Sequence, residues 1–509
     1  MIYLIGLDIG TSGVKAIIID ARGKVKATAS QEYPMSTPHA LWAEQDPNEW
    51  WKATARVLRQ VAKRADVKFA DVKAIGLTGQ MHGLVLLDNA GKVLRPCIMW
   101  NDQRTADQCQ AITTRIGAQQ LLEITGNPVL PGFTAPKILW VREHEPQVYK
   151  HASRILLPKD YIRYRLSGEY ITEVSDASGT SLLDVKKREW SSEILRALEI
   201  PAEWMPAIVE SPEQAGSVNR IAARETGLKE GTLIVGGGGD QAAGAVGSGI
   251  VREGIISVTI GTSGVVFAHS EHYRVEPQGR LHAFCHAVSG TWHLMGVTLS
   301  AGGSLRWFRD AFCQEEKHVA KITRRDPYEV MMAEAAKCPA GSEGLLFLPY
   351  LSGERTPYPD PYARGAFLGL TLRHSKAHMI RSVLEGVAFS LRDCLELMKA
   401  MGIPVSDVRV SGGGARSKFW RQILADVMDT GLTTVTTTEG ASYGAALLAS
   451  VGSGVFGSVA EACDKTVRPV STTNPRSDRA KYQDHYQIYK EAYSKNRSLF
   501  HSLSGLPEQ

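Results

Sequence analysis

The chain of 509 residues contains few cysteines, and none of them are paired in sequence. No CxxC spacing occurs among its seven cysteines. A scattered, odd-numbered set of this kind indicates neither a disulfide framework nor a structural zinc site, and it favours buried free thiols in a reducing compartment. The seven positions are Cys97, Cys109, Cys285, Cys313, Cys338, Cys394 and Cys463.

Long apolar runs and blocks of like charge are also missing. The apolar N-terminal run is broken at Asp8 and has no basic segment before it, so we expect no signal peptide, no membrane span and a cytoplasmic location. The formal net charge is only +5, and 58 Lys and Arg residues are interleaved with 53 Asp and Glu residues. We therefore expect no nucleic-acid partner.

A repeated phrase is the most informative feature that is present. The six residues IGTSGV occur at 9–14 and again at 260–265, each time after an apolar, strand-like run. A chain of this length exceeds what one hydrophobic core holds, so two domains of about 250 residues are expected. We place them at 1–245 and 246–509.

Periodicity and turn residues predict a similar order of elements in both halves. In the first half we expect strands at 2–9, 14–20 and 24–33, a helix at 47–65, a strand at 72–80 and a hairpin at 84–96. Asp46 would cap the helix, and Glu49 would complete a capping box. In the second half we expect strands at 255–268 and 291–300, helices at 304–312 and 376–401, a strand at 407–412, a helix at 418–429, a strand at 432–438 and a helix at 443–451. A polar helix at 476–499 would pack on the outside, and the fold class is α/β, with two similar halves facing one another across a cleft.

The two repeated turns have the composition of a phosphate site. Gly10–Gly13 and Gly261–Gly264 each combine consecutive backbone N–H groups with small hydroxyls, which suits an anion-binding nest. A tight hairpin turn is the alternative for either copy alone, but the duplication favours phosphate. The sequence has no Walker A motif. Asp8 precedes the first turn, where a carboxylate beside phosphates requires a cation such as Mg²⁺, unless it only caps its own turn. Thr259 takes that place in the second copy, which indicates a single metal site.

Three further stretches carry polar groups at strand ends. Gly236–Gly239 lead from an apolar strand to Asp240, a carboxylate that could accept a proton from an attacking hydroxyl or could be a plain turn residue. SGGGARS at 411–417 offers bare backbone to a nucleotide, although such turns are common. GQMHG at 79–83 and MWNDQR at 99–104 suit a polyhydroxylated ligand, with His82 either a ligand contact or structural. The polar and aromatic residues of these last two stretches are Gln80, His82, Trp100, Asn101, Asp102 and Arg104.

One motif points to a different chemistry. Residues 440–444, GASYG, match the nucleophile elbow GxSxG of hydrolases. Only 65 residues follow, which is too few for the remaining strands and the acid and histidine partners of a hydrolase, so we expect no serine nucleophile here.

Together these stretches resemble the FGGY carbohydrate kinases over essentially the whole chain. The segments that carry the resemblance are, in order, LDIGTSGVK, LWAEQDPNEWW, GQMHG, RPCIMWNDQR, PGFTAPK, LLPKDY, GGGDQAAGAVG, LPYLSGERTP and GGGARS. The resemblance implies two duplicated ribonuclease H-like, actin-like ATPase domains flanking a cleft, an N-terminal one for sugar and a C-terminal one for nucleotide. It also implies ATP and Mg²⁺ as cofactors, a small sugar as the binding partner, and a homodimer as one candidate assembly.

The resemblance assigns roles to individual residues. Asp240 would be the general base, and Asp8 would lie by the metal and phosphates. The sugar would contact Met81, His82, Trp100, Asp240 and Gln241. ATP would contact Thr11, Ser12, Lys15, Gly261, Thr262, Gly302, Gly413 and Ser417. Gln241 stands where some similar kinases have Asn, which bears on which ketose fits.

The implied reaction is in-line transfer of the γ-phosphoryl group of ATP to O5 of D-xylulose. Another ketose such as ribulose, or a polyol, is the nearest alternative substrate. An ATP-driven switch protein on the same duplicated fold is an alternative from a different class, although such a protein would not require GQMHG or GGGGDQ.

Overall fold

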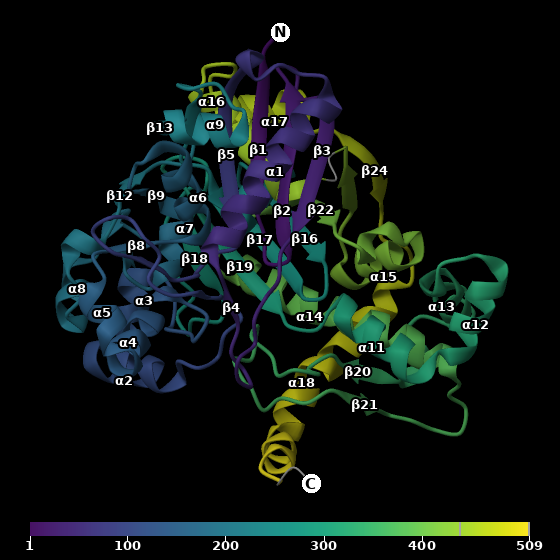
Figure 1. Cartoon of the computed structure of the whole chain (residues 1–509). Coiled ribbons are helices and arrows are strands. Elements are labelled where there is room, and N and C mark those ends of the chain that lie inside the picture. The colour runs from purple at the N-terminus through teal and green to yellow at the C-terminus, as the bar shows by residue number, and fades with distance from the viewer. Residues whose placement is uncertain (437–438, 507–509) are drawn as a thin grey trace.

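The computed structural model describes residues 1–436 and 439–506, arranged as two α/β halves that each contain a seven-stranded mixed sheet (Figure 1). The first sheet has the order β13-β14-β5-β1-β2-β3, with β15 added against β5. Its strands are β1 (Tyr3–Ile9), β2 (Gly13–Asp20), β3 (Val25–Glu32), β5 (Val72–Gly79), β13 (Gln214–Ser217), β14 (Leu233–Val235) and β15 (Gly238–Gly239).

The second sheet repeats this plan in the order β18-β19-β17-β16-β22-β23-β24. Strand β16 is antiparallel to β17 and parallel to β22, just as β1 is antiparallel to β2 and parallel to β5. The strands are β16 (Gly254–Ile260), β17 (Gly264–Ser270), β18 (His282–Cys285), β19 (Trp292–Thr298), β22 (Val405–Ser411), β23 (Leu432–Val435) and β24 (Pro469–Thr473). The duplicated α/β fold expected from the repeat is therefore present.

Each sheet is covered by helices on both faces, because its central strands are apolar on both sides. In the first sheet Ile5 and Leu7 face helix α1 (Pro47–Ala65), while Leu4 faces helix α16 (Gly440–Gly452). In the second sheet Val258 packs with α14 (Lys376–Ala400), and Phe267 packs on α10 (Asp240–Gly247). The two inner helices, α10 and α16, also pack against each other.

Glycines allow α16 to approach the first sheet and α10 very closely. A Cβ on Gly6 would lie 1.8 Å from the carbonyl oxygen of Ser442, and one on Gly76 would lie 1.9 Å from that of Ala445. On the helix itself, a Cβ on Gly444 would lie 1.7 Å from the carbonyl oxygen of Ala243. A segment near the C-terminus is thus part of the core beneath the first repeated turn.

The remaining elements surround the sheets. The other helices of the first half are α2 (Ala106–Ile116), α3 (Ala118–Thr125), α4 (Thr134–His144), α5 (Pro146–His151), α6 (Pro158–Ser167), α7 (Val174–Ala177), α8 (Ser192–Leu198) and α9 (Arg220–Thr226). Those of the second half are α11 (Gly302–Phe312), α12 (Gln314–Thr323), α13 (Pro327–Ala335), α15 (Lys418–Met428), α17 (Val459–Thr466) and α18 (Arg479–Ser504). Short strands outside the two sheets are β4 (Glu44–Gln45), β6 (Val85–Leu87), β7 (Cys97–Ile98), β8 (Arg154–Leu156), β9 (Ile171–Glu173), β10 (Leu183–Asp184), β11 (Glu189–Trp190), β12 (Ala207–Val209), β20 (Leu346–Leu348) and β21 (Ala366–Leu368).

Most of the expected elements are present, with corrections in detail. The hairpin expected at 84–96 forms with a short second arm: Val93 bridges Leu87, and the Leu94 N–H donates to the Leu86 carbonyl at 3.0 Å. Strand β6 also pairs with β8 from residues 154–156. Asp46 caps α1 by accepting from Asn48 N at 2.9 Å, whereas Glu49 bonds Lys52 and completes no capping box. Helix α18 packs on the outside of the second half, as expected, and buries one row of aromatic side chains in its core. The end of the strand expected at 432–438 falls on residues 437–438, outside the described residues.

All seven cysteines are buried and free, as expected. Among the described helices, none combines the length and apolar character needed to cross a membrane.

Candidate functional site

The GQMHG stretch leaves β5 at Gly79 and turns sharply at His82, whose φ of 70° is left-handed. The His82 ring stacks on Phe133 with centroids 4.6 Å apart, and its Nδ1 lies 2.6 Å from the carbonyl oxygen of Gly179. Burial lowers the pKa of His82 to about 3, so the ring is neutral at physiological pH. Because Nδ1 must donate to that carbonyl, Nε2 carries the lone pair and can accept a hydrogen bond from a ligand hydroxyl.

Helix α4 fixes this turn through residues that sequence reasoning had not singled out. The buried Lys137 Nζ donates to the carbonyl oxygens of His82 at 2.9 Å and Gly132 at 2.7 Å, and Thr134 Oγ1 donates to the His82 carbonyl at 3.0 Å. Burial lowers the pKa of Lys137 to about 7. The sequence signal for them was the PGFTAPK segment, which ends at Lys137.

Asp240 is the first residue of α10, directly after the glycines of the GGGGD stretch. Met81 occupies the space beside Gly239, since a Cβ there would lie 2.9 Å from the Met81 sulfur. Met81 therefore lies beside the glycine that precedes Asp240, and His82 follows Met81 in the same turn. Burial raises the pKa of Asp240 to about 6, against opposing hydrogen bonds from the backbone and side chain of Gln241.

Asp8, at the end of β1, lies close enough to Asp240 for their charges to interact. Burial first, and then the charge of Asp240, raise the pKa of Asp8 to about 7, while Lys15 opposes the shift. Its carboxylate accepts no hydrogen bond within residues 1–436 and 439–506. An unpartnered carboxylate beside a second carboxylate fits a hydrated divalent cation that also binds phosphates. Groups of three or more metal-ligating side chains are not found in the described part of the chain, so any such ion would depend on one or two carboxylates.

Lys15 lies close enough to Asp8 for its charge to lower the pKa of that carboxyl group. It is opposite Asp8 in the β1–β2 register, and its ammonium group forms an ion pair with Glu439 at the start of α16. This contact joins the first half of the chain to a helix from the second. In the second copy of the turn, Thr259 takes the place of Asp8, and its hydroxyl lies 3.0 Å from that of Ser411.

The first repeated turn is tied to the sugar-side residues. Its Gly10 N–H donates to the Gly13 carbonyl at 3.0 Å, while the N–H groups of Thr11 and Ser12 donate to no group in the described chain. The Trp100 indole N–H donates to Thr11 Oγ1 at 2.9 Å, and Gln45 Nε2 donates to the Thr11 carbonyl at 2.7 Å. The turn therefore presents two free N–H groups from an anchored backbone.

The second repeated turn sits on the N-terminus of α11. Gly302 N donates to the Gly261 carbonyl and Gly303 N to the Thr262 carbonyl, each at 2.9 Å. A Cβ on Gly302 would lie 2.5 Å from the Gly261 oxygen, so only glycine permits this contact. Here too, the N–H groups of Thr262 and Ser263 have no acceptor among the described residues.

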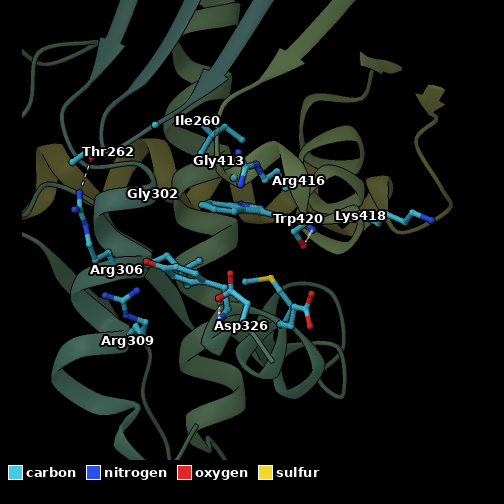
Figure 2. Close-up of a pocket in the computed structure, with 17 residues that line it drawn as sticks. Ile260, Thr262, Gly302, Arg306, Arg309, Asp326, Gly413, Arg416, Lys418 and Trp420 are labelled. Atoms are coloured by element: carbon cyan, nitrogen blue, oxygen red, sulfur yellow. Dashed lines mark hydrogen bonds between the residues drawn. The ribbon is translucent and has the colours of Figure 1, made fainter. Parts of the chain in front are cut away.

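A cavity of about 950 Å³ opens beside this turn (Figure 2). Its lining includes all five of the second-half residues assigned to the nucleotide, namely Gly261, Thr262, Gly302, Gly413 and Ser417. The remaining lining residues are Ile260, Leu305, Arg306, Arg309, Asp326, Tyr328, Glu329, Met332, Gly414, Arg416, Lys418 and Trp420. This volume is large enough for a nucleotide-sized ligand.

Sequence reasoning missed the cationic and aromatic part of this cavity. Figure 2 shows Arg306 reaching from α11 to Thr262, where its Nη2 donates to the hydroxyl at 2.7 Å. Arg309 lies over the ring of Tyr328 at 4.9 Å, and the buried Trp420 forms one wall. The pair at 306 and 309 has the i, i+3 spacing of one helix face, which was the available signal.

Arg355 is a second missed residue. It lies in the SGERTP segment between two anchored neighbours: Glu354 accepts from Thr298 Oγ1 at 2.6 Å, and Thr356 Oγ1 donates to the Arg280 carbonyl at 2.9 Å. The Arg355 charge is close enough to lower the pKa of His82. Within the described chain its guanidinium forms no hydrogen bond or ion pair, so a cation from the second half lies near the His82 turn.

Asp102 and Arg104 of the NDQR stretch, in contrast, make structural contacts within the protein. Asp102 Oδ2 accepts from Ala43 N at 2.7 Å, and Arg104 pairs with both Asp102 and Glu44 at 2.7 Å. Arg104 also lies 3.6 Å from the ring centre of Trp42. These contacts hold the loop that presents Trp100, whose side chain remains 43% exposed.

The GxSxG match is structural, as expected. Ser442 is completely buried in α16, and its hydroxyl donates to the Glu439 carbonyl at 2.9 Å. A buried hydroxyl that is already bonded within its own helix cannot act as an exposed nucleophile.

The repeated sheets, each with a Gly-Thr turn, define the duplicated ribonuclease H-like class of actin-like ATPases. Residues 3–247 match the N-terminal domain, and residues 256–453 the C-terminal domain, of the FGGY family of carbohydrate kinases. This chain therefore belongs to the FGGY family and is a carbohydrate kinase.

Two sequence relatives and one crystal structure are similar to this chain over nearly its whole length. A xylulose kinase of Bacillus subtilis (strain 168) is 40% identical over 500 residues, which covers 98% of each chain. One from Escherichia coli (strain K12) is 41% identical over 490 residues, covering 96% of this chain and 98% of that one. The crystal structure of a xylulose kinase from Brucella ovis superposes with a TM-score of 0.90 at 38% identity, over 98% of this chain and 100% of the other.

Proposed function

We propose that this kinase phosphorylates D-xylulose at O5, with ATP as the donor and Asp240 as the general base. The observation that carries the proposal is the grouping of Asp240 with Met81 and His82, together with the pKa of about 6 that burial gives Asp240. A base of that pKa is ionised at neutral pH and is a better proton acceptor than an ordinary Asp. The similarity to xylulose kinases supports the choice of ketose.

In the proposed reaction, the O5 proton of the sugar passes to Asp240 as O5 bonds to the γ-phosphorus. The bond from that phosphorus to the β–γ bridging oxygen breaks, and ADP leaves with the electron pair. The free N–H groups of Thr11, Ser12, Thr262 and Ser263 and the guanidinium of Arg306 would stabilise negative charge on the phosphates. Mg²⁺, when bound, would be held by Asp8 and would offset the repulsion between the carboxylates and the phosphates.

Neutral His82 would orient the sugar by accepting a hydroxyl hydrogen through Nε2, while Trp100 would supply an aromatic plate. Gln241 bears on which ketose fits, because its side chain lies against Asp240. The division at residues 1–245 and 246–509, the cytoplasmic location and the homodimer stay predictions.

The test is coupled ADP release at saturating Mg-ATP with D-xylulose, D-ribulose, L-xylulose, D-fructose, glycerol, D-gluconate and no sugar. Gluconate belongs in the panel because the unpaired Arg355 charge near His82 would suit a carboxylate. We expect strong stimulation by D-xylulose and D-xylulose 5-phosphate as the product. A preference for another sugar would reject the substrate, and equal ATP turnover without sugar would indicate a switch protein instead.

A further inference from the structure

A fully buried cluster of charged side chains lies directly behind the glycine loop that presents Asp240. Its charged members are two cations and three carboxylic acids on α6, β9 and α7, each with no exposed side-chain surface: Lys159, Asp160, Arg163, Glu173 and Asp176. Lys159 contacts Asp160 at 2.8 Å, Asp176 at 3.1 Å and Glu173 at 3.3 Å. Arg163 contacts Asp160 at 2.7 Å.

This cluster is electrically balanced when Asp176 is neutral. Burial raises the pKa of Asp176 to about 8, against the opposing charge of Lys159. Two cations then face two carboxylates, which reduces the high cost of burying unpaired charge. Buried ion pairs gain little stability over well-packed apolar residues, so stability alone does not account for this cluster.

Two contacts connect the cluster to the loop. Ser175 Oγ accepts a hydrogen bond from Gly239 N at 3.0 Å and donates to Glu173 Oε1 at 2.9 Å. Gly239 immediately precedes Asp240, so this bond holds the Gly238–Gly239 peptide, one peptide before the residue that carries the carboxylate. At the other end of the loop, Arg163 donates to the Gly236 carbonyl.

We propose that Ser175 is a positioning residue for Asp240, acting through the Gly239 N–H, with the ionic cluster as its rigid support. Glu173 orients the hydroxyl, because its carboxylate also accepts from Ser175 N at 2.7 Å, Asp176 N at 2.9 Å and Ser211 Oγ at 2.9 Å. This inference rests on the proposed role of Asp240. Misplacing a reacting group by about 1 Å can cost about a hundredfold in rate, which gives such a bond kinetic consequences.

The matched control is Ser211. Both hydroxyls are buried, and both donate to the same Glu173 carboxylate at 2.9 Å, but among the described residues the Gly239 N–H donates to Ser175 Oγ and not to Ser211 Oγ. Ser175→Ala and Ser211→Ala should therefore lower the thermal midpoint similarly, while only Ser175→Ala releases the loop.

Steady-state kinetics of wild type, Ser175→Ala, Ser175→Cys, Ser211→Ala and Asp240→Asn across pH 5–8.5 test the proposal. We expect Ser175→Ala to lower kcat at least about tenfold, with the sugar KM within about twofold. Its acid limb should move to lower pH as water reaches Asp240, beside which Asp8 also titrates. Ser175→Cys, with a weaker acceptor of similar shape, should be intermediate, and Ser211→Ala should behave like wild type.

The outcomes separate this inference from the proposed function. If Asp240→Asn is inactive but Ser175→Ala and Ser175→Cys keep the wild-type kcat and acid limb, the positioning role of Ser175 is rejected. The general-base role of Asp240 is then retained. Equal losses of kcat in Ser175→Ala and Ser211→Ala would also reject it, since the effect would then be general destabilisation. A fully active Asp240→Asn would reject the base itself.

Discussion

The indole N–H of Trp100 donates to the hydroxyl of Thr11 over 2.9 Å, and this bond joins the aromatic plate proposed for the sugar to the turn proposed for the phosphate. The two residues are 89 positions apart in sequence. They meet because β7, which precedes Trp100, pairs with β4, and Gln45 of β4 donates to the Thr11 carbonyl at 2.7 Å. A substitution at either residue should therefore affect the binding of both the sugar and ATP.

Trp100→Phe should keep an aromatic ring at this position and lose the hydrogen bond to Thr11. A net hydrogen bond contributes about 0.5–1.5 kcal/mol, so we expect the KM for the sugar or for ATP to rise about two- to tenfold. Initial-rate kinetics with each substrate varied would measure this. Trp190→Phe is the control, since its indole N–H also donates a single bond, to the Pro206 carbonyl at 2.8 Å. Equal KM values for wild type and Trp100→Phe would contradict the coupling.

Asp240→Asn should stabilise the fold at high pH. The folded-state pKa of Asp240 is raised to about 6 from 3.8, so protonation favours folding at low pH and this stability is lost as pH rises through 6. Asn cannot ionise, and the variant should be more stable by up to about 3 kcal/mol at pH 8, with the difference shrinking towards pH 4. Urea denaturation at both pH values would measure it. A variant less stable than wild type at pH 8 would show that burial does not raise the pKa of Asp240.

Acid should destabilise the protein through histidines in the second sheet. His269 and His293 are cross-strand partners on β17 and β19, and burial lowers their pKa values to about 4 and about 3. The unfolded chain binds these protons near pH 6.5, so stability is complete above that pH and is lost as pH falls towards 4.

His293→Phe should therefore flatten the pH dependence of unfolding by about 2 kcal/mol between pH 7 and pH 5. A phenyl ring can keep the stacking on Phe267, now at 4.3 Å. The exposed His318 on α12 provides the control variant His318→Gln, which should leave the profile unchanged. An unaltered slope in His293→Phe would contradict the assignment.

Two adjacent glycines should respond differently to alanine. A Cβ on Gly413 meets nothing within 4 Å, whereas one on Gly414 would lie 2.5 Å from Ile260 Cγ2 and 2.8 Å from the Trp420 ring. Gly413→Ala should leave the thermal midpoint unchanged and raise the KM for ATP, because the added methyl group enters the cavity. Gly414→Ala should cost about 1–3 kcal/mol of stability by overpacking. Differential scanning fluorimetry and ATP kinetics would separate the two effects. An unchanged KM for ATP in Gly413→Ala would show that Gly413 does not line the nucleotide site.

Local sequence patterns were sufficient for most elements, because their apolar periodicity agrees with tertiary burial. They missed contacts that depend on a distant partner. The hairpin at 84–96 forms, but the additional pairing of β6 with β8 depends on where residues 154–156 lie in the fold. Helix α18 reads as polar, yet Tyr482, Tyr486 and Tyr489 carry hydroxyls that find buried partners such as Glu385 and Asp393.

The candidate site was predictable where glycines and short polar residues follow strands, as at the two repeated turns and at Asp240. Two arginines, Arg306 and Arg355, were missed, because their importance depends on partners far away in sequence. Arg306 bonds Thr262 from the next helix, and Arg355 reaches the vicinity of His82 from the other half of the chain. Lys15 at the phosphates stays a prediction, and its ion pair with Glu439, more than 400 residues later, could not be read from the sequence.

The role of Asp240 is tested most directly by measuring ADP release and D-xylulose binding for wild type and Asp240→Asn in parallel at pH 8 with saturating Mg-ATP. Removing the base while keeping its polar shape should leave the dissociation constant for D-xylulose within a few-fold and lower kcat by about 10²–10⁴-fold. Wild-type turnover in Asp240→Asn, with D-xylulose still bound, would contradict the account.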